Sequence, residues 1–321
     1  MPKFKQILGF SGGGVRGIVT ATWLDHLIKN ELIDLDKLYS ISGTSTGSVI
    51  AAALCKPDPY QPHEISQLFK EVSVQVFKRK SWRPAWLDSV LFFAPHDIKK
   101  LREILEFHLG NSLLGDCRRN FVCVTYSLNA SLGPRHFASN PLIIHSYDSP
   151  FSSNRYLDYK LVDCVAGSCA APSYFRPYTF QQGDRYHIWT DGGLCSNASI
   201  LSNYLVCRDQ FTGEAIKAEE ISALLLGNGT RYSHETKKSL AGWKTPRMLR
   251  ALKDSIVQAN EIYELKSLRR LLRSRFYYFN CPLPQEIELD HYDQVDFLES
   301  FAKDKIKHMG MLSSWLEGYF H

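Results

Sequence analysis

The feature that most constrains the fold is a unit of strand, glycine turn and helix that occurs twice within the first 55 residues. Residues 5–10 form a short apolar run that ends in S-G-G-G, and apolar side chains then recur at helical spacing through residues 15–30. Residues 38–42 form a second short strand, which G-T-S-T-G connects to a helix of small residues. The repeated unit predicts parallel strands with helical crossovers and functional groups at the carboxyl ends of the strands.

The rest of the 321-residue chain continues to alternate between helical and strand patterns. Helices are expected at residues 63–77, 97–109, 157–166, 196–208, 246–265 and from 293 to the end, and strands at residues 120–127, 185–190, 221–226 and 273–279. The chain has no internal repeat and no linker rich in Gly, Pro or Ser. We therefore expect one domain over residues 1–321, with core motifs in residues 5–230 and a helical and strand completion in residues 231–321.

Composition and charge exclude several classes of protein. The chain is 44% hydrophobic and 22% charged, and its formal charge of +5 is too small for a nucleic-acid-binding footprint. No apolar run approaches the length that spans a bilayer, and the first residues lack the design of a signal peptide. The eight cysteines form no C-x-x-C pair, which favours buried free thiols in a reducing compartment over a zinc site. We expect a cytoplasmic protein without a metal, although export by a signal-less route, as bacterial effectors use, stays open.

The first glycine turn is a candidate anion site. Residues 12–17 read G-G-G-V-R-G and stand where a helix begins, so bare backbone N–H groups meet the positive end of the helix dipole there. An oxyanion that develops on a carbonyl during acyl transfer needs such donors, already oriented. Arg16 adds a fixed positive charge or braces the loop.

The same letters, from Gly12 to Gly17, match the dinucleotide fingerprint G-x-G-x-x-G, which is weak when it stands alone. That fingerprint also needs an acidic residue at the end of the next strand, where it holds the ribose. Asp34 and Asp36 lie at about the right distance, but both precede the strand at residues 38–42. A Rossmann-type nucleotide-binding protein is therefore the alternative hypothesis. A tight turn without a ligand is disfavoured because three consecutive glycines cost backbone entropy.

The second turn, residues 43–47, reads G-T-S-T-G and stands between a strand and a helix. Gly43 and Gly47 allow the sharp turn that lifts the hydroxyl of Ser45 above the sheet, as in a nucleophile elbow. A serine that only caps the following helix is the alternative. The context of strand, turn and helix favours a nucleophile at Ser45.

A nucleophilic serine needs a base, and none of the eleven histidines stands in a comparable tight turn. Asp191 does, because it ends the strand at residues 185–190 and is followed by Gly192 and Gly193, which allow another segment to approach closely. An Asp-Gly hairpin is the alternative, but the next residues have a helical pattern. An aspartate is a weak base at its usual pKa, so it must be partly desolvated or its proton transfer must be concerted with attack.

These three turns, in this order, resemble those of the patatin-like phospholipase family, which carries G-G-G-x-R/K-G, G-x-S-x-G and D-G-G/A motifs. Residues 170–175, 226–229 and 289–290 are also similar to later segments of that family, so the resemblance spans nearly the whole chain. It implies an α/β fold of three layers, with a mainly parallel central sheet covered by helices. One departure is visible: residues 197–199 read N-A-S, where the family often has Asn-x-Pro.

The resemblance also implies a lipid acyl hydrolase of the phospholipase A or lysophospholipase type, without a metal or organic cofactor. Carried over by position, Ser45 attacks the carbonyl and Asp191 takes its proton. The implied oxyanion loop comprises Gly12, Gly13, Gly14 and Arg16, with the N–H groups of Gly13 and Gly14 as donors. Two alternatives remain open: a storage or interaction protein with an idle dyad, and an α/β-hydrolase with a histidine triad, whose nucleophile normally follows several strands.

Two basic segments are candidates for peripheral contact with a membrane, where a phospholipid or lysophospholipid substrate resides. Residues 78–86 combine four positive charges with two tryptophans and precede V-L-F-F, a composition typical of interfacial segments. A loop whose aromatic side chains pack inward is the alternative, since no amphipathic period is present. Residues 237–275 carry eleven Lys or Arg against three acids, which fits a solvated helix face, an anionic lipid surface or a regulatory anion.

Overall fold

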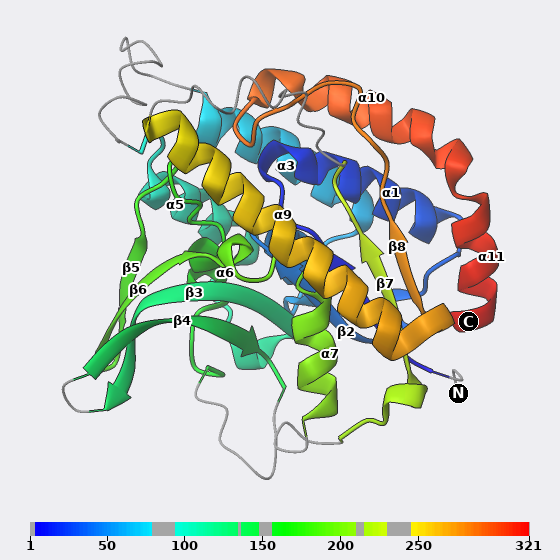
Figure 1. The fold of residues 1–321 in the computed structure, drawn as a ribbon, viewed down its shortest axis with the longest axis horizontal. Helices are drawn as coiled ribbons and strands as arrows, with labels where there is room; N and C mark the ends of the chain where they lie inside the picture. The colour runs from blue at the N-terminus through cyan, green and yellow to red at the C-terminus, as the bar shows by residue number, and fades with distance from the viewer. Residues whose placement is uncertain are drawn as a thin grey trace.

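The computed structural model describes residues 4–78, 94–133, 136–147, 156–209, 215–229 and 245–320. These residues form one eight-stranded mixed sheet in the order β5-β6-β3-β2-β1-β7-β8, with β4 also paired to β3. Helices flank the sheet, and the long helix α9 crosses the front of the molecule (Figure 1). The predicted α/β fold with helices covering a central sheet is therefore confirmed.

The part of the sheet around β1 is parallel. β1 (Lys5–Phe10) pairs with β2 (Leu38–Thr44) and β7 (Ile221–Leu226), and the two outer partners are β3 (Asn120–Gly133) and β8 (Phe276–Phe279). Each of these neighbouring pairs runs in the same direction, as the repeated strand-turn-helix unit predicts. Their carboxyl ends therefore meet at one edge, which is where the glycine turns lie.

The other part of the sheet is antiparallel. β3 pairs with β4 (His136–His145) and β6 (Arg185–Asp191), and β6 pairs with β5 (Tyr178–Gln182). β6 is predicted from the sequence, whereas β4 and β5 are not. β5 alternates between buried and exposed side chains and β4 contains Pro141, so neither forms the continuous apolar run that marks a strand buried on both faces.

Burial of both sheet faces produces three layers. Leu8 and Phe10 on β1 belong to one apolar cluster, while Ile7, which directly precedes Leu8, belongs to a second, because successive side chains on a strand point to opposite faces. The first cluster packs under most of the helices and the second under α7 and α9. The helices are α1 (Gly17–Lys29), α2 (Thr46–Cys55), α3 (Pro62–Phe77), α5 (Ile98–Leu109), α6 (Leu161–Ser168), α7 (Ile200–Arg208), α9 (Thr245–Leu272), α10 (Val295–Lys305) and α11 (Gly310–Tyr319).

Local signals define several helix ends. α3 begins with Pro62 in its first turn and with Glu64 accepting the Gln61 N–H at 2.6 Å, and the Asp97 carboxylate accepts the Lys99 N–H at the start of α5. The helix expected from residue 293 onward is two helices, α10 and α11, separated by a 3₁₀ turn at Ile306–His308. Residues 273–275 form a 3₁₀ turn rather than the start of β8.

The cysteines match the expectation of buried free thiols. All eight cysteines are free and six are buried. In the described part of the chain, no helix is both long enough and apolar enough to cross a bilayer.

Candidate active site

The three turns predicted to meet do lie together at one edge of the sheet. Thr44, the last residue of β2, pairs with Val124 on β3, and Asp191, the last residue of β6, pairs with the next residue, Thr125. Because β3 lies between β2 and β6, the two strand ends are about two strand spacings apart, roughly 10 Å. Ser45 directly follows β2, so its side chain and that of Asp191 reach the same region from opposite sides of β3.

Ser45 occupies a sharp turn between β2 and α2. Its φ of 53° and ψ of −127° is a conformation that residues with a Cβ rarely adopt. The flanking glycines are required by contact: a Cβ on Gly43 would lie 2.0 Å from the Gly47 carbonyl oxygen, and a Cβ on Gly47 would lie 2.3 Å from the carbonyl oxygen of Phe10. The predicted elbow at residues 43–47 is thus a tightly packed turn in which neither glycine tolerates a side chain.

Hydrogen bonds hold the Ser45 turn in this conformation. The Ser45 N–H donates to Ser168 Oγ at 2.9 Å, and Ser168 Oγ in turn donates to the carbonyl of Val124 at 2.6 Å. Ser48 Oγ donates to the Ser45 carbonyl at 2.6 Å. Since the backbone of Ser45 is bound on both sides, the strained dihedral angles are imposed by the surrounding fold.

Asp191 is 6% exposed and begins a 3₁₀ turn, Gly192–Leu194, rather than a hairpin. Its Oδ1 accepts the Gly193 N–H at 2.7 Å, which fixes the orientation of the carboxylate. A Cβ on Gly192 would lie 2.1 Å from the carbonyl oxygen of Val124, so this glycine allows the turn to pack directly on β3. The alternative Asp-Gly hairpin is wrong for this segment.

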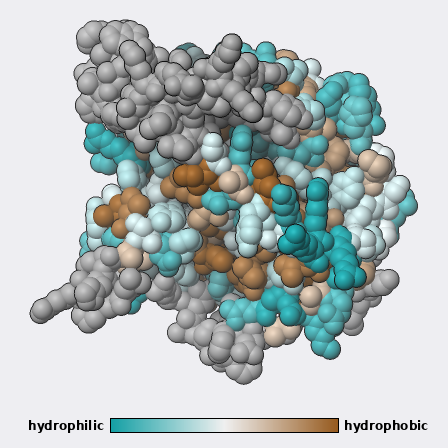
Figure 2. All heavy atoms as spheres, viewed as in Figure 1, coloured by the Kyte–Doolittle hydropathy of each residue, from teal (hydrophilic) through white to brown (hydrophobic). Residues whose placement is uncertain are grey.

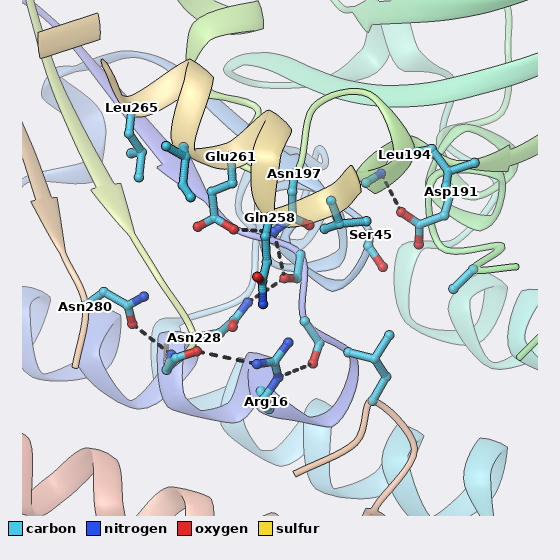
Figure 3. A pocket seen from close by; sticks show the side chains of 18 of the residues that line it. Arg16, Ser45, Asp191, Leu194, Asn197, Asn228, Gln258, Glu261, Leu265 and Asn280 are labelled. Atoms are coloured by element: carbon cyan, nitrogen blue, oxygen red, sulfur yellow. Dashed lines mark hydrogen bonds between the residues drawn. The ribbon is translucent and has the colours of Figure 1, made fainter. Parts of the chain in front are cut away.

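Ser45 and Asp191 line the same cavity, whose volume is about 360 Å³. Figure 3 shows the Ser45 hydroxyl and the Asp191 carboxylate directed toward one another at one end of this cavity. Polar side chains from α9 and from the ends of β7 and β8 line its other end. The arrangement brings a hydroxyl and a buried carboxylate together beside space for a ligand.

The glycine loop lies against the Ser45 turn, since a Cβ on Gly12 would be 3.1 Å from the Cβ of Ser45. The Gly12 N–H donates to the Asn197 carbonyl at 3.1 Å and the Gly13 N–H donates to Thr46 Oγ1 at 3.1 Å. Within the described residues, the Gly14 N–H has no hydrogen-bond acceptor. Of the predicted oxyanion donors, Gly14 is therefore open and Gly13 is engaged by a hydroxyl.

Gly14 must be glycine for two reasons. Its φ is +57°, and a Cβ there would lie 2.2 Å from the carbonyl oxygen of Leu289. The same carbonyl accepts the Val15 N–H at 2.9 Å. Leu289 belongs to the segment that resembles the C-terminal part of the family, and it holds the glycine loop in place.

Arg16 braces the loop rather than only adding charge to it. It is buried, its Nε donates to the Gly13 carbonyl at 3.2 Å and its Nη1 donates to the Gly229 carbonyl at 3.4 Å. Asn228 supports the loop from the same side, with Nδ2 donating to the Gly12 carbonyl at 2.7 Å. The late glycine turn after β7, which resembles that of the family, thus lies beside the candidate site, a role that the sequence pattern does not assign to it.

Asn197 is a site residue that sequence reasoning noted only as a departure from the family pattern. Its carbonyl accepts the Gly12 N–H and its Nδ2 donates to Glu261 at 2.9 Å, so it joins the glycine loop to α9. Ser199, which stands where the family often has proline, has a φ of 57°. A proline ring restricts φ to about −65°, so the departure accompanies a different entry into α7.

α9 supplies a second acid that the sequence pattern did not single out. Glu264 is 4% exposed, accepts the Ala198 N–H at 3.0 Å and is hydrogen-bonded to Ser196 Oγ. Burial raises the pKa of Glu264 to about 7. α9 is therefore attached, through Glu264 and Glu261, to the segment that follows Asp191.

The two basic segments differ in how much of each the structure describes. Residues 79–93, which include most of the first segment, lie outside the described residues. The described part of the second segment lies mainly on α9, where Lys266, Arg269 and Arg270 are exposed.

Comparison with known proteins agrees with the three motifs. A family model described as patatin-like phospholipase matches residues 8–203. Patatin-like protein 4 of Arabidopsis thaliana is 30% identical over 210 residues, which cover 61% of this chain and 50% of that protein. The cGAMP-activated phospholipase of Pseudomonas aeruginosa is 26% identical over 281 residues, which cover 85% of this chain and 77% of that protein.

Among solved structures, the chain resembles VipD from Legionella pneumophila with a TM-score of 0.41 and 13% identity, covering 94% of this chain and 67% of that one. The chain spans between about half and two thirds of the length of the plant patatin-like proteins it matches. The Rossmann-type alternative is not favoured by any of these matches. Because the family model covers more than half of the sequence, the chain belongs to the patatin-like phospholipase family.

Proposed function

We propose that this protein is a lipid acyl hydrolase of the phospholipase A or lysophospholipase type, with Ser45 as the nucleophile and Asp191 as the base. The observation that carries the proposal is the strained backbone of Ser45, at a point where its hydroxyl shares a cavity with a buried carboxylate. A strained turn between strand and helix is how many serine hydrolases expose their nucleophile. Family membership supports a phospholipid or lysophospholipid as the substrate.

In the proposed acylation step, Ser45 Oγ bonds to the ester carbonyl carbon while its proton passes to the Asp191 carboxylate. The carbonyl oxygen becomes an oxyanion that accepts hydrogen bonds from the N–H groups of Gly13 and Gly14. For this, the Gly13 N–H gives up its hydrogen bond to Thr46 Oγ1 and donates to the oxyanion instead. Collapse of the intermediate breaks the bond between the carbonyl carbon and the alcohol oxygen, and Asp191 returns the proton to that oxygen. Water then repeats the cycle, which releases the fatty acid and restores both side chains.

Fatty-acid release from phospholipid vesicles and from a soluble p-nitrophenyl ester tests the dyad. Ser45→Ala and Asp191→Asn should each lower kcat by at least about a thousandfold, because each removes a partner of one proton transfer. Ser314→Ala and Asp184→Asn, both at exposed positions, are the matched controls and should retain wild-type rates. Full activity in either dyad variant would refute the assignment.

A fluorophosphonate probe separates a working dyad from an idle one. The probe should label the wild-type chain on the peptide that carries Ser45, and Asp191→Asn should slow that labelling because the hydroxyl loses its base. Unlabelled Ser45 would favour a storage or interaction protein with an idle dyad. A rise in melting temperature with NAD(P) would support the nucleotide-binding alternative instead.

A further inference from the structure

A second cavity begins at Ser45 and differs in character from the first. It is smaller, about 40 Å³ against about 360 Å³, and its lining is almost entirely apolar. The two cavities share Ser45, Ala171 and Leu289, but Asp191 lines only the first and Gly14 only the second. Ser45 therefore stands between two spaces of different chemistry.

The apolar cavity lies among α2, α3 and α5. Its walls are buried carbon side chains, including Val49 on α2, Leu68 and Phe69 on α3, and Leu101 on α5, each 5% exposed or less. Val49 follows Ser45 by one helical turn, so it lies on the same face of α2 as the nucleophile. A space lined mainly by carbon in this way accepts an apolar ligand and offers few partners to a charged or hydroxylated one.

The larger cavity also has apolar walls, Leu265 among them, but polar side chains gather at its far end. Asn197, Gln258, Glu261 and Tyr278 present polar atoms there, and Glu261 is hydrogen-bonded to both Asn197 and Tyr278. Hydroxyl and amide groups of a ligand find partners among such side chains. The polar part of an ester therefore finds more partners in this cavity than in the apolar one.

Proton transfer decides which part of the ester enters which cavity, an argument that rests on the proposed function. The tetrahedral carbon carries an oxyanion, an acyl chain and an alcohol, besides Ser45 Oγ. The alcohol oxygen must receive the proton that Asp191 holds when the bond to the carbonyl carbon breaks, so the alcohol has to lie on the side of Asp191. The oxyanion lies toward the glycine loop, which leaves the apolar cavity for the chain.

We propose that the apolar cavity between α2, α3 and α5 is the subsite for the fatty-acyl chain, and that the larger cavity under α9 takes the alcohol part of the ester. Selectivity for acyl length then depends on side chains such as Val49 and Leu68, and selectivity for the alcohol depends on side chains of α9.

Hydrolysis of p-nitrophenyl esters from acetate to laurate by the full chain tests this assignment. The measured quantity is the ratio of kcat/KM for the laurate ester to that for the acetate ester, which cancels losses common to both. Val49→Phe fills the cavity beside Ser45 and should lower the ratio at least about tenfold. Leu68→Ala enlarges the cavity and should move the preferred acyl length upward, so the two variants shift the ratio in opposite directions.

Two controls separate the subsite from general damage. Val74→Phe, at a position on α3 that is 45% exposed and outside both cavities, should leave the ratio and the rates unchanged. Gln258→Ala lies in the larger cavity and should leave the acyl ratio unchanged while altering the preference among alcohols. For any variant that folds but hydrolyses esters slowly, the rates of labelling by short-chain and long-chain alkyl fluorophosphonates compare the two chain lengths without the need for turnover.

An acyl ratio that stays constant in Val49→Phe and Leu68→Ala but changes in Gln258→Ala would overturn the assignment and place the chain under α9. That result would leave the proposed dyad intact. Absence of ester hydrolysis and of Ser45 labelling in the wild-type chain would instead refute the proposed function, and the subsite with it.

Discussion

At the scale of single residues, the conformation of Ser45 carries a cost that the fold sustains. Its φ of 53° with ψ of −127° belongs to a region populated mainly by glycine, and such a residue costs of order 1–3 kcal/mol. Strain of this kind persists where surrounding contacts over-determine the backbone, as the hydrogen bonds from Ser45 N–H and to its carbonyl do. These hydrogen bonds fix the backbone of Ser45 and with it the direction of its Cα–Cβ bond.

The strain predicts an unusual order of stability. Ser45→Gly should be more stable than Ser45→Ala by about 1 kcal/mol, because glycine adopts this conformation without a Cβ penalty. Both variants should be inactive, and urea denaturation measures the difference between them. Ala52, in the interior of α2, is the matched control: there Gly should be less stable than Ala by about 1 kcal/mol. Equal stability of the two Ser45 variants would show that the turn is not strained.

A site residue can be predicted from the sequence when the residues it depends on are close to it in the chain. Local motifs identify Ser45, Asp191 and the flanking glycines, because a tight turn restricts the residue types at adjacent positions. Asn197 and Asn228 support the site through hydrogen bonds to Gly12, which lies 185 and 216 residues away. A contact of that kind leaves no local pattern, so folding the chain is the only way to find it.

At the scale of elements, two glutamates of α9, Glu261 and Glu264, bind the helix to residues 196–198, although the segment that contains α9 is mainly basic. Glu264 lies on the buried face of α9 with Leu268 and Leu272, while the cations of the helix are exposed to solvent. The sequence pattern predicts the solvated cations but gives no sign that an acid faces inward, because burial of a carboxylate depends on what lies opposite. The antiparallel strands β4 and β5 are missed for a related reason, since strands with mixed burial lack the continuous apolar run of a strand that is buried on both faces.

The pKa of Glu264 predicts how stability depends on pH. Burial raises this pKa from 4.5 to about 7, with the nearby charge of Glu261 acting in the same direction. Between these values the unfolded chain has released the proton and the folded chain still holds it, so stability falls as pH rises from about 4.5 to about 7 and then levels off. A rise of the pKa from 4.5 to about 7 corresponds to about 3 kcal/mol of stability lost over that interval.

Glu264→Gln tests this dependence, because glutamine resembles the protonated acid and keeps partners for Ala198 N–H and Ser196 Oγ. The free energy of unfolding, measured in urea from pH 5 to pH 8, should fall less steeply in the variant, which becomes the more stable chain at pH 8. Glu219→Gln, an exposed substitution of the same kind, should run parallel to wild type. Parallel curves for Glu264→Gln as well would mean that Glu264 ionises as easily in the folded chain as in the unfolded one.

At the scale of the whole molecule, the candidate site depends on segments from most of the chain. The glycine loop after β1, the Ser45 turn after β2 and the Asp191 turn after β6 are supported by the ends of β7 and β8 and covered by α9. The parallel half of the sheet is predictable because its strands are apolar runs followed by glycine turns. The sequence does not predict which side of the site is open to the outside, because this depends on how α9 packs over the site.

That packing leaves both apolar and basic side chains of α9 exposed. Figure 2 shows apolar side chains gathered over the middle of the face on which α9 lies. Three apolar residues of α9 are about half exposed or more: Ile256, Ile262 and Tyr263. The cations Lys266, Arg269 and Arg270 are exposed on the same helix. Apolar side chains beside cations on a helix that covers the cavity are typical of contact with an anionic membrane.

We therefore expect Ile256→Glu and Tyr263→Glu to reduce hydrolysis of phospholipid in anionic vesicles about tenfold each, since an acid removes apolar contact and adds repulsion. Neither residue lines a cavity of the candidate site, so hydrolysis of a soluble short-chain ester should stay at the wild-type rate. Met311→Glu on α11, at a position that is 77% exposed, is the matched control for an added charge elsewhere. Binding to the same vesicles, measured by co-sedimentation, should fall in parallel with hydrolysis and should weaken for wild type as salt rises. If vesicle hydrolysis falls equally in Met311→Glu, net charge rather than the α9 surface governs access to lipid; if it falls in none of them, α9 is not the face that meets the membrane.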